Sequence, residues 1–258
     1  MRKTLALLIM VCTTYCINAQ NIELGARGYA ATFWLLNSAS PVTGTSPTKT
    51  FSLSYGGGLH LAYDFTDHAG IEFTPMYGMW SQTYSGNYNT SGFLPDGTVY
   101  VNGESYTSKI AFTTYQLPLL ICFENDGGSF VEIGAEYDMI QAATYSASYS
   151  SPDGNRSFNA LPAYSNSNIM AIVGFGGKYS LGNNFFILTD FRIQYGLTDM
   201  KGVDGQGQTY DSAPFYSSAS PTHTLYGSVN LGLFYMIQIT QTHKMGHQKC
   251  RGPARARG

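Results

Sequence analysis

The sequence predicts an all-β fold, an eight-stranded antiparallel transmembrane β-barrel built as an up-and-down meander, and three observations predict it. Eight stretches alternate apolar and polar residues, so each predicted strand has one apolar face. The connectors between them alternate between long and short, which gathers the long loops at one end. Only 12% of residues are charged while 14% are aromatic, a composition typical of a sheet whose outer face meets lipid instead of water.

The predicted strands are long and regular. In the last one, Leu231, Leu233 and Tyr235 share one face while Asn230 and Gly232 share the other. Most strands reach the roughly 9–11 residues that a tilted strand needs to cross the hydrocarbon of a bilayer. The eight stretches are residues 21–36, 50–65, 70–80, 109–123, 130–145, 168–180, 185–197 and 224–239.

The connectors predict the orientation of the barrel. Short turns of such barrels face the periplasm and long loops face outward. An even number of strands brings both termini to the periplasmic side. The long, extracellular connectors are residues 37–49, 81–108, 146–167 and 198–223, and the short turns are 66–69, 124–129 and 181–184.

Aromatic residues recur near the predicted borders of the membrane. Aromatic rings concentrate at both interfaces of membrane barrels, where they form girdles. The residues expected in these girdles are Phe33, Trp34, Tyr63, Phe65, Tyr77, Trp80, Phe123, Phe130, Tyr179, Phe185 and Tyr195.

The two ends of the chain differ from the barrel. Residues 1–19 have two basic residues, a short apolar run and a small residue at the end, which predicts a cleaved secretion signal peptide. The barrel domain is expected over residues 20–240. Residues 241–258 carry five basic and no acidic residues, and we expect a disordered tail whose role the sequence does not explain.

Charge and cysteine content limit the partners. Residues 20–240 hold 16 acidic and 7 basic residues, a net charge of −9, so the domain offers no reason to expect nucleic acid as a partner. Outer-membrane lipid, including lipopolysaccharide, is the expected surrounding, and a monomer is expected. After signal cleavage Cys122 and Cys250 remain, and the sequence leaves open whether they form a disulfide bond.

Charged residues also fall on the inward face of the strands. We expect a polar network in the lumen that contains Glu132, Glu136, Asp190 and Arg192, with Arg192 as a central counter-ion and Glu132 or Glu136 among its partners. Buried carboxylates need such partners. The role expected is structural, because an eight-stranded interior is just filled by side chains. A proton or ion path is the alternative.

Signals for catalysis are weak. No histidine has a serine or carboxylate at an informative spacing, so the chain is not expected to be an enzyme, and no cofactor is expected. His243, His247 and Cys250 could ligate a soft metal only if the tail formed a helical turn, and the Gly, Pro and Arg residues around them disfavour this. No metal site is therefore predicted.

Two segments resemble a known family. Tyr115 to Ile121, with a proline inside a strand, and the hairpin from Phe175 to Asp199, with Arg192 followed by Tyr195-Gly196-Leu197, are similar to motifs of the PorT-like outer-membrane β-barrel family of Bacteroidetes. The resemblance spans residues 20–239 and implies a small barrel inserted in the outer membrane of a Gram-negative bacterium. Its motifs are structural and imply little about activity.

The function expected from the sequence is that of a structural barrel or a surface-interaction protein. It would act through its long loops, with an extracellular ligand or protein bound at residues 81–108 and 198–223, whose tyrosines suit adaptable contact surfaces. The alternatives are an accessory barrel of a transport or secretion system and a narrow porin. A lipid-modifying enzyme and a soluble ligand-binding barrel remain further alternatives.

Overall fold

A computed structural model describes residues 21–37, 48–87, 91–93, 99–149, 155–201 and 221–239. The predicted signal peptide, the basic tail and most of the connectors 37–49 and 198–223 lie outside these residues. The elements are β1 (Asn21–Asn37), β2 (Thr48–Thr50), β3 (Leu53–Thr66), β4 (Ala69–Phe73), β5 (Met76–Asn87), β6 (Gly92–Phe93), β7 (Val99–Tyr100), β8 (Ser105–Glu124), β9 (Ser129–Tyr149), β10 (Asn155–Asn159), the 3-10 helix η1 (Leu161–Ala163), β11 (Ser167–Gly182), β12 (Phe185–Gly196) and β13 (Thr222–Gln238).

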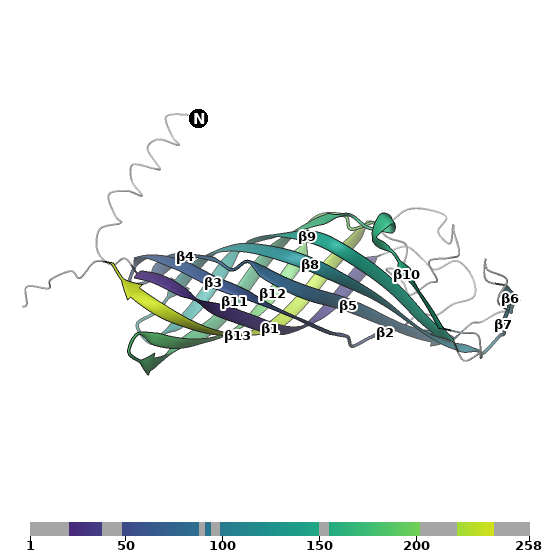
Figure 1. Ribbon diagram of the computed structural model, residues 1–258, viewed down its shortest axis with the longest axis horizontal. Helices are drawn as coiled ribbons and strands as arrows, with labels where there is room; N and C mark the ends of the chain where they lie inside the picture. The colour runs from purple at the N-terminus through teal and green to yellow at the C-terminus, as the bar shows by residue number, and fades with distance from the viewer. Residues whose placement is uncertain are drawn as a thin grey trace, which may run out of the picture.

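The long strands close into a barrel (Figure 1). Each pairs antiparallel with its neighbour in the chain, and β8 pairs with β9, so the sheet is continuous from β1 to β13. The ring closes where β1 pairs with β13 over the whole of both strands, from Asn21 opposite Gln238 to Asn37 opposite Thr222. With β4 and β5 counted as one interrupted strand, the ring has eight strands, as predicted. The three short turns lie at one end of the barrel, which we call the turn end, and the opposite end is the loop end.

The third predicted strand, residues 70–80, is split into β4 and β5. The interruption at Thr74 and Pro75 lies beside Pro118 of β8. Proline has no N–H, so two neighbouring strands lack a donor at the same level. The carbonyl groups there are still used: Leu59 N donates to Pro75 O at 3.1 Å and Thr74 N donates to Pro118 O at 3.4 Å.

The outer face of the ring is apolar. Large apolar side chains of alternate residues are exposed on most strands, for example Leu119 and Ile121 of β8 and Leu231 and Leu233 of β13, each about half exposed or more. The outward-facing aromatics include Tyr77, Tyr115, Phe123, Tyr179, Phe185 and Tyr195. The expectation was wrong for Phe33, Trp80 and Phe130, which are buried inside the barrel. Their positions along the chain suggested a border, but their parity on the strand decides the face.

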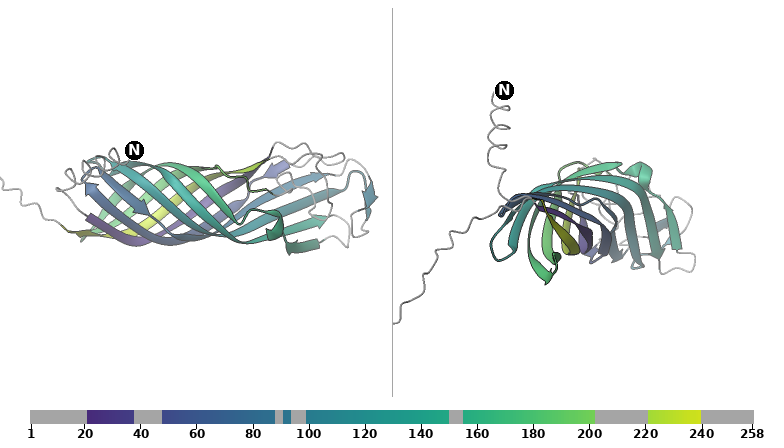
Figure 2. Two further views of the ribbon diagram at one scale, coloured as in Figure 1. Left: turned by 90° about the horizontal axis from the view of Figure 1, so that it is seen from above. Right: turned by 60° about the vertical axis from the view of Figure 1, so that its left-hand side comes forward.

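At the loop end the sheet continues past the ring along one side of the barrel (Figures 1 and 2). This sheet extension consists of β2, the far half of β5, the first half of β8, the last part of β9 and β10. The connectors predicted at 81–108 and 146–167 are therefore partly strand, because β5 runs to Asn87, β8 starts at Ser105 and β9 runs to Tyr149. The polar residues in these segments favoured a loop prediction, whereas hydrogen bonds to neighbouring strands make the segments part of the sheet.

A bulge separates the extension from the ring. The β8–β9 register shifts between Thr113 and Thr114, which pair with Ala142 and Ile140, so Gln141 has no partner residue. A bulge turns the strand and shifts its alternation by one residue. As a result Ala143, Tyr145 and Ala147 are buried beyond it, although they share parity with residues that face outward before it.

The interior has two apolar clusters. The larger one fills the loop-end half of the barrel and continues under the extension, and its core includes Phe33, Trp80, Phe112, Tyr145 and Tyr226. The smaller one, Phe130, Leu188 and Phe234, lies in the other half. No helix in the described part of the chain is long and apolar enough to span a membrane.

Two glycines, Gly58 and Gly227, differ in how closely a neighbouring strand approaches them, which allows a test. At Gly58 an added methyl group would meet the backbone of Pro75 and Met76, while at Gly227 it would meet only Thr32 Cγ2 at 4.0 Å. We expect Gly58→Ala to lower the free energy of unfolding of the barrel by about 1–3 kcal/mol. Gly227→Ala should leave this free energy almost unchanged. The melting temperature, followed by the gel shift between folded and heat-denatured barrel, measures both. Equal melting temperatures would contradict the close approach at Pro75.

Candidate functional site

The lumen contains a buried charged cluster that joins strands from around the ring. Arg27 of β1 forms ion pairs with Glu72 of β4 and Asp190 of β12. Arg192 of β12 pairs with Glu132 of β9 and with Glu72, whose Oε1 lies 2.6 Å from Arg192 Nη2. All five side chains are at most 5% exposed. Each arginine thus bridges carboxylates from different strands, and we call this group the arginine cluster.

The arginine cluster depends on neighbouring residues that provide space for its side chains and donate hydrogen bonds to its carboxylates. Asn230 of β13 donates to Asp190 Oδ1 at 2.7 Å. At Gly174 of β11 an added methyl group would meet the carboxyl group of Glu132, and at Gly176 it would meet Asp190. Buried ion pairs stabilise only when their geometry is good and the remaining polar atoms find partners, and the glycines provide the space for that geometry.

A second polar group lies toward the turn end. Lys178 Nζ lies 2.7 Å from Glu23 Oε1 and 2.8 Å from Glu124 Oε2. His60 Nε2 contacts Glu23 Oε2 at 2.9 Å, and its ring lies against Phe234 with centroids 5.1 Å apart. His60 is therefore held between a carboxylate and an aromatic ring.

A third polar group lies on β9 toward the loop end. Glu136 and Asp138 are at most 1% exposed, and neither forms an ion pair with an arginine or lysine of the described chain. Both carboxylate oxygens of Glu136 and Oδ1 of Asp138 lack a hydrogen-bond donor. Asp138 Oδ2 accepts a hydrogen bond from Asn168 Nδ2 at 3.4 Å. These two carboxyl groups therefore lie outside the ion-pair network of the described lumen.

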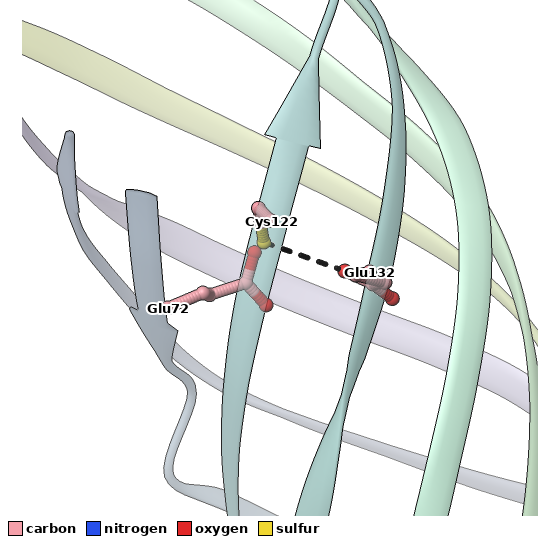
Figure 3. A group of neighbouring side chains, drawn as sticks. All are labelled: Glu72, Cys122 and Glu132. Atoms are coloured by element: carbon pink, nitrogen blue, oxygen red, sulfur yellow. Dashed lines mark hydrogen bonds between the residues drawn. The ribbon is translucent and has the colours of Figure 1, made fainter. Parts of the chain in front are cut away.

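One group of side chains near the arginine cluster has the composition of a metal site. Ligand atoms of Glu72, Cys122 and Glu132 all lie within 4.8 Å of one another (Figure 3). Both carboxylates are already paired with guanidinium groups, which would repel a cation placed between them. The thiol contacts Glu132 Oε2 at 4.0 Å and has no disulfide partner among the described residues. Its alternative partner, Cys250, lies outside them.

The structure places the four predicted lumen residues in two groups. Glu132, Asp190 and Arg192 meet in the arginine cluster, while Glu136 lies apart and contacts Asp138 instead of Arg192. Sequence reasoning did not find the central roles of Arg27 and Glu72 or the neutral partners Asn168 and Asn230. Their inward parity was readable, but the register that brings distant strands to one level was not.

The closed ring, the apolar outer face and the filled polar lumen define the chain as a β-barrel of the outer-membrane type. No protein-family model matches the chain, and no curated protein matches its sequence.

Solved structures of outer-membrane proteins are similar to this chain at low identity. Ail, the attachment invasion locus protein of Yersinia pestis, is 12% identical, with 86% of this chain and 100% of that chain covered and a TM-score of 0.32. OprG of Pseudomonas aeruginosa is 13% identical over 85% and 96% of the two chains, with a TM-score of 0.37. The protease OmpT of Escherichia coli is 9% identical over 85% and 97%, with a TM-score of 0.39. The assignment to the barrel class rests on the strand pairing of this chain and not on these similarities.

The arginine cluster gives a direct test. Replacing Arg192 by methionine leaves the carboxylates of Glu132 and Glu72 buried with less compensation, and breaking a buried pair costs about 3–5 kcal/mol. We therefore expect Arg192→Met to lower the melting temperature of the barrel clearly. Lys109→Met, which removes a cation from an exposed position of β8, is the control and should melt like the wild type. An unchanged melting temperature of Arg192→Met would show that the cluster does not hold the ring together.

Proposed function

We propose that this protein is an outer-membrane barrel of a Gram-negative bacterium that acts outside the cell as a surface-interaction protein, through its sheet extension and long loops. The single observation that carries the proposal is the change of chemistry along the outer face of β8. Its outward side chains are apolar from Tyr115 to Phe123, while Ser105, Thr107 and Lys109 are polar and exposed. The extension therefore suits water, and the ring suits lipid.

The filled lumen supports contact at the surface over passage through the barrel. The arginine cluster and the aromatic cluster occupy successive levels of the interior. A narrow porin or a transport accessory, the alternative functions, would need these side chains to move aside. A non-enzymatic role and membership in the PorT-like family are part of the same proposal. Purified barrel in planar bilayers is expected to show no steady openings, and large, steady channels would favour the porin.

The extension also offers a surface that a partner can reach. Its outward positions on β9 are small and polar, including Thr144 and Ser148, both exposed. Its inward positions, among them Tyr84 and Tyr145, are buried in the aromatic cluster. Such a sheet is supported by apolar contacts on its inner face and presents a polar outer face, which suits contact with another macromolecule or with a cell surface.

Orientation is tested by labelling. In a chain lacking its own mature cysteines (Cys122→Ser and Cys250→Ser), Thr107→Cys should react with a membrane-impermeant maleimide on intact cells. Asp67→Cys, in an exposed short turn, should react only after the cells are opened. The reverse pattern would place the extension in the periplasm and contradict the proposed surface role.

Binding is tested by shortening the hairpin. Residues 83–109 can be replaced by Asn-Gly, which joins Gln82 to Ile110 across an existing pair. Intact cells displaying the wild-type barrel are expected to capture a host or neighbouring-cell component by chemical crosslinking, and cells displaying the shortened barrel are expected not to. The gel shift shows whether the shortened variant is folded. If the folded variant still captured the same component, the proposed role of the extension would be contradicted.

A further inference from the structure

A hollow lies on the outer face of the sheet extension, where β2, β5 and β8 run side by side. Its volume of about 400 Å³ falls within the range of small-ligand sites, roughly 300–1,000 Å³. Tyr106 is 4% exposed and has the inward parity of β8, so it contributes backbone atoms and not its ring. The lining residues are Thr48, Ser85, Gly86, Asn87, Ser105, Tyr106 and Thr107. The side chains that line the hollow therefore end in hydroxyl or amide groups.

The register of the three strands gathers these polar groups on one face. Ser85 of β5 stands opposite both Thr48 of β2 and Thr107 of β8, and Asn87 stands opposite Ser105. Residues directly opposite each other on neighbouring strands share a face, with Cβ atoms about 4.5–5.5 Å apart. Thr107 is exposed and has the parity of the lipid-facing side chains of β8. The hydroxyl and amide groups are therefore presented together on the outside of the extension.

The lining of the hollow selects the chemical class of its ligand. Phosphate and sulfate groups are bound by arginine, lysine or helix N-termini, metal ions of the calcium type by carboxylates, and acyl chains by apolar walls. None of these lines the hollow. The charged side chains beside it are engaged elsewhere: Lys49 Nζ donates to Leu35 O at 2.6 Å, and Glu104 Oε2 accepts a hydrogen bond from Val101 N at 3.1 Å. Uncharged hydroxyl and amide groups match a ligand that is itself rich in hydroxyl groups, which is a saccharide.

The height of the hollow above the membrane limits which saccharide reaches it. Tyr77 and Tyr115 are each about half exposed, with ring centroids 5.4 Å apart, and no outward aromatic residue follows them on β5 or β8 toward the loop end. Thr107 precedes Tyr115 by eight residues, which is about 27 Å along a strand and about 20 Å along the membrane normal for a strand tilted by roughly 35–45°. The headgroup zone of a bilayer is only about 5–8 Å thick on each side. Phospholipid head groups therefore do not reach the hollow, whereas the sugar chain of a glycolipid does.

The direction and charge of this outer face indicate where the saccharide comes from. The extension continues the wall of the barrel along one side (Figures 1 and 2), so its outer face is directed sideways over the membrane, toward the lipids that surround the barrel. Lys109, two residues closer to the ring than Thr107, is exposed, and none of the described outward residues of the extension is acidic. This charge suits the phosphate groups that lipopolysaccharide carries near its lipid end.

We propose that the hollow binds sugar residues of a glycolipid in the outer leaflet of the protein's own membrane. Ser85, Asn87 and Thr107 exchange hydrogen bonds with the sugar hydroxyl groups. The inference rests on the outward orientation given under Proposed function and goes beyond it. The glycolipid supports the extension from the side, and the long loops stay free for a partner outside the cell.

The test measures sugar binding to the purified, full-length barrel in phospholipid nanodiscs. The probe is the soluble oligosaccharide that mild acid releases from the lipopolysaccharide of the bacterium's own outer membrane, and binding is followed by calorimetric titration. We expect saturable binding by the wild type and an affinity about tenfold lower for the double variant Ser85→Ala/Thr107→Val, which loses two hydrogen-bonding hydroxyl groups. Thr144→Val removes an exposed hydroxyl group of β9 outside the hollow and should bind like the wild type. Maltohexaose, a neutral sugar chain from another source, should bind the wild type at least about tenfold more weakly.

The gel shift reports whether each variant is folded, and the two single variants, each expected to lose about threefold in affinity, replace the double variant if it is not. A folded wild-type barrel that does not bind the oligosaccharide would overturn the proposal. Equal affinity in the wild type and the double variant would place the sugar elsewhere, and equal affinity for maltohexaose would remove the assignment to the glycolipid.

Labelling of Thr107→Cys separates this failure from a failure of the proposed function. If the cysteine is labelled on intact cells and the oligosaccharide does not bind, the glycolipid site is wrong while the surface role stands. If it is labelled only after the cells are opened, the extension lies in the periplasm and both proposals are wrong.

Discussion

Closure of the backbone hydrogen-bond ring between β1 and β13 is the constraint on which the rest of the structure depends. An unpaired strand edge in hydrocarbon leaves each N–H and C=O without a partner, at several kcal/mol each. Pairing from Asn21–Gln238 to Asn37–Thr222 removes that edge. Closing only eight strands makes the interior narrow, so the inward residues must fill it, and any charge among them is buried. The arginine cluster follows from this, because Arg27 and Arg192 compensate carboxylates contributed by other strands.

The sequence was sufficient to predict the ring of strands. It was insufficient to predict which inward residues of different strands lie at the same height in the lumen. Alternation from Leu225 to Ile239 and the short turns predict eight strands and their order, since both depend on local parity. What parity omits is register: it places Glu136 and Arg192 in one lumen but does not show that Arg192 meets Glu132 and Glu72 instead. Parity also misleads beyond Gln141, where one extra residue reverses the face of Ala143 and Tyr145. Phe33 and Trp80 seemed to mark a border by position, although their parity directs them inward.

The two interruptions of the sheet differ in a way that marks the border between the lipid-facing and the water-facing parts of the outer surface. At Pro75 and Pro118, in the apolar part of the ring, the carbonyl groups are still bonded, to Leu59 N and Thr74 N. The bulge at Gln141 leaves a residue without a partner in the ladder, which is tolerable where solvent can bind it. At this same level the outer face of β8 changes from Tyr115, apolar, to polar residues. Backbone pairing and side-chain chemistry therefore place the border of the hydrocarbon independently at one level.

The border separates two parts of the protein with different chemistry. Below it, ion pairs from β1, β4, β9 and β12 tie the ring together. Above it, the sheet extension belongs to β2, β5, β8, β9 and β10 alone and rests on apolar contacts such as those of Tyr84 and Tyr145. Substitutions on its outer face, at Thr107 or Thr144, share no partner with the arginine cluster, so their effects should add to those in the lumen. The outer surface can therefore be changed by substitution while the ring stays intact.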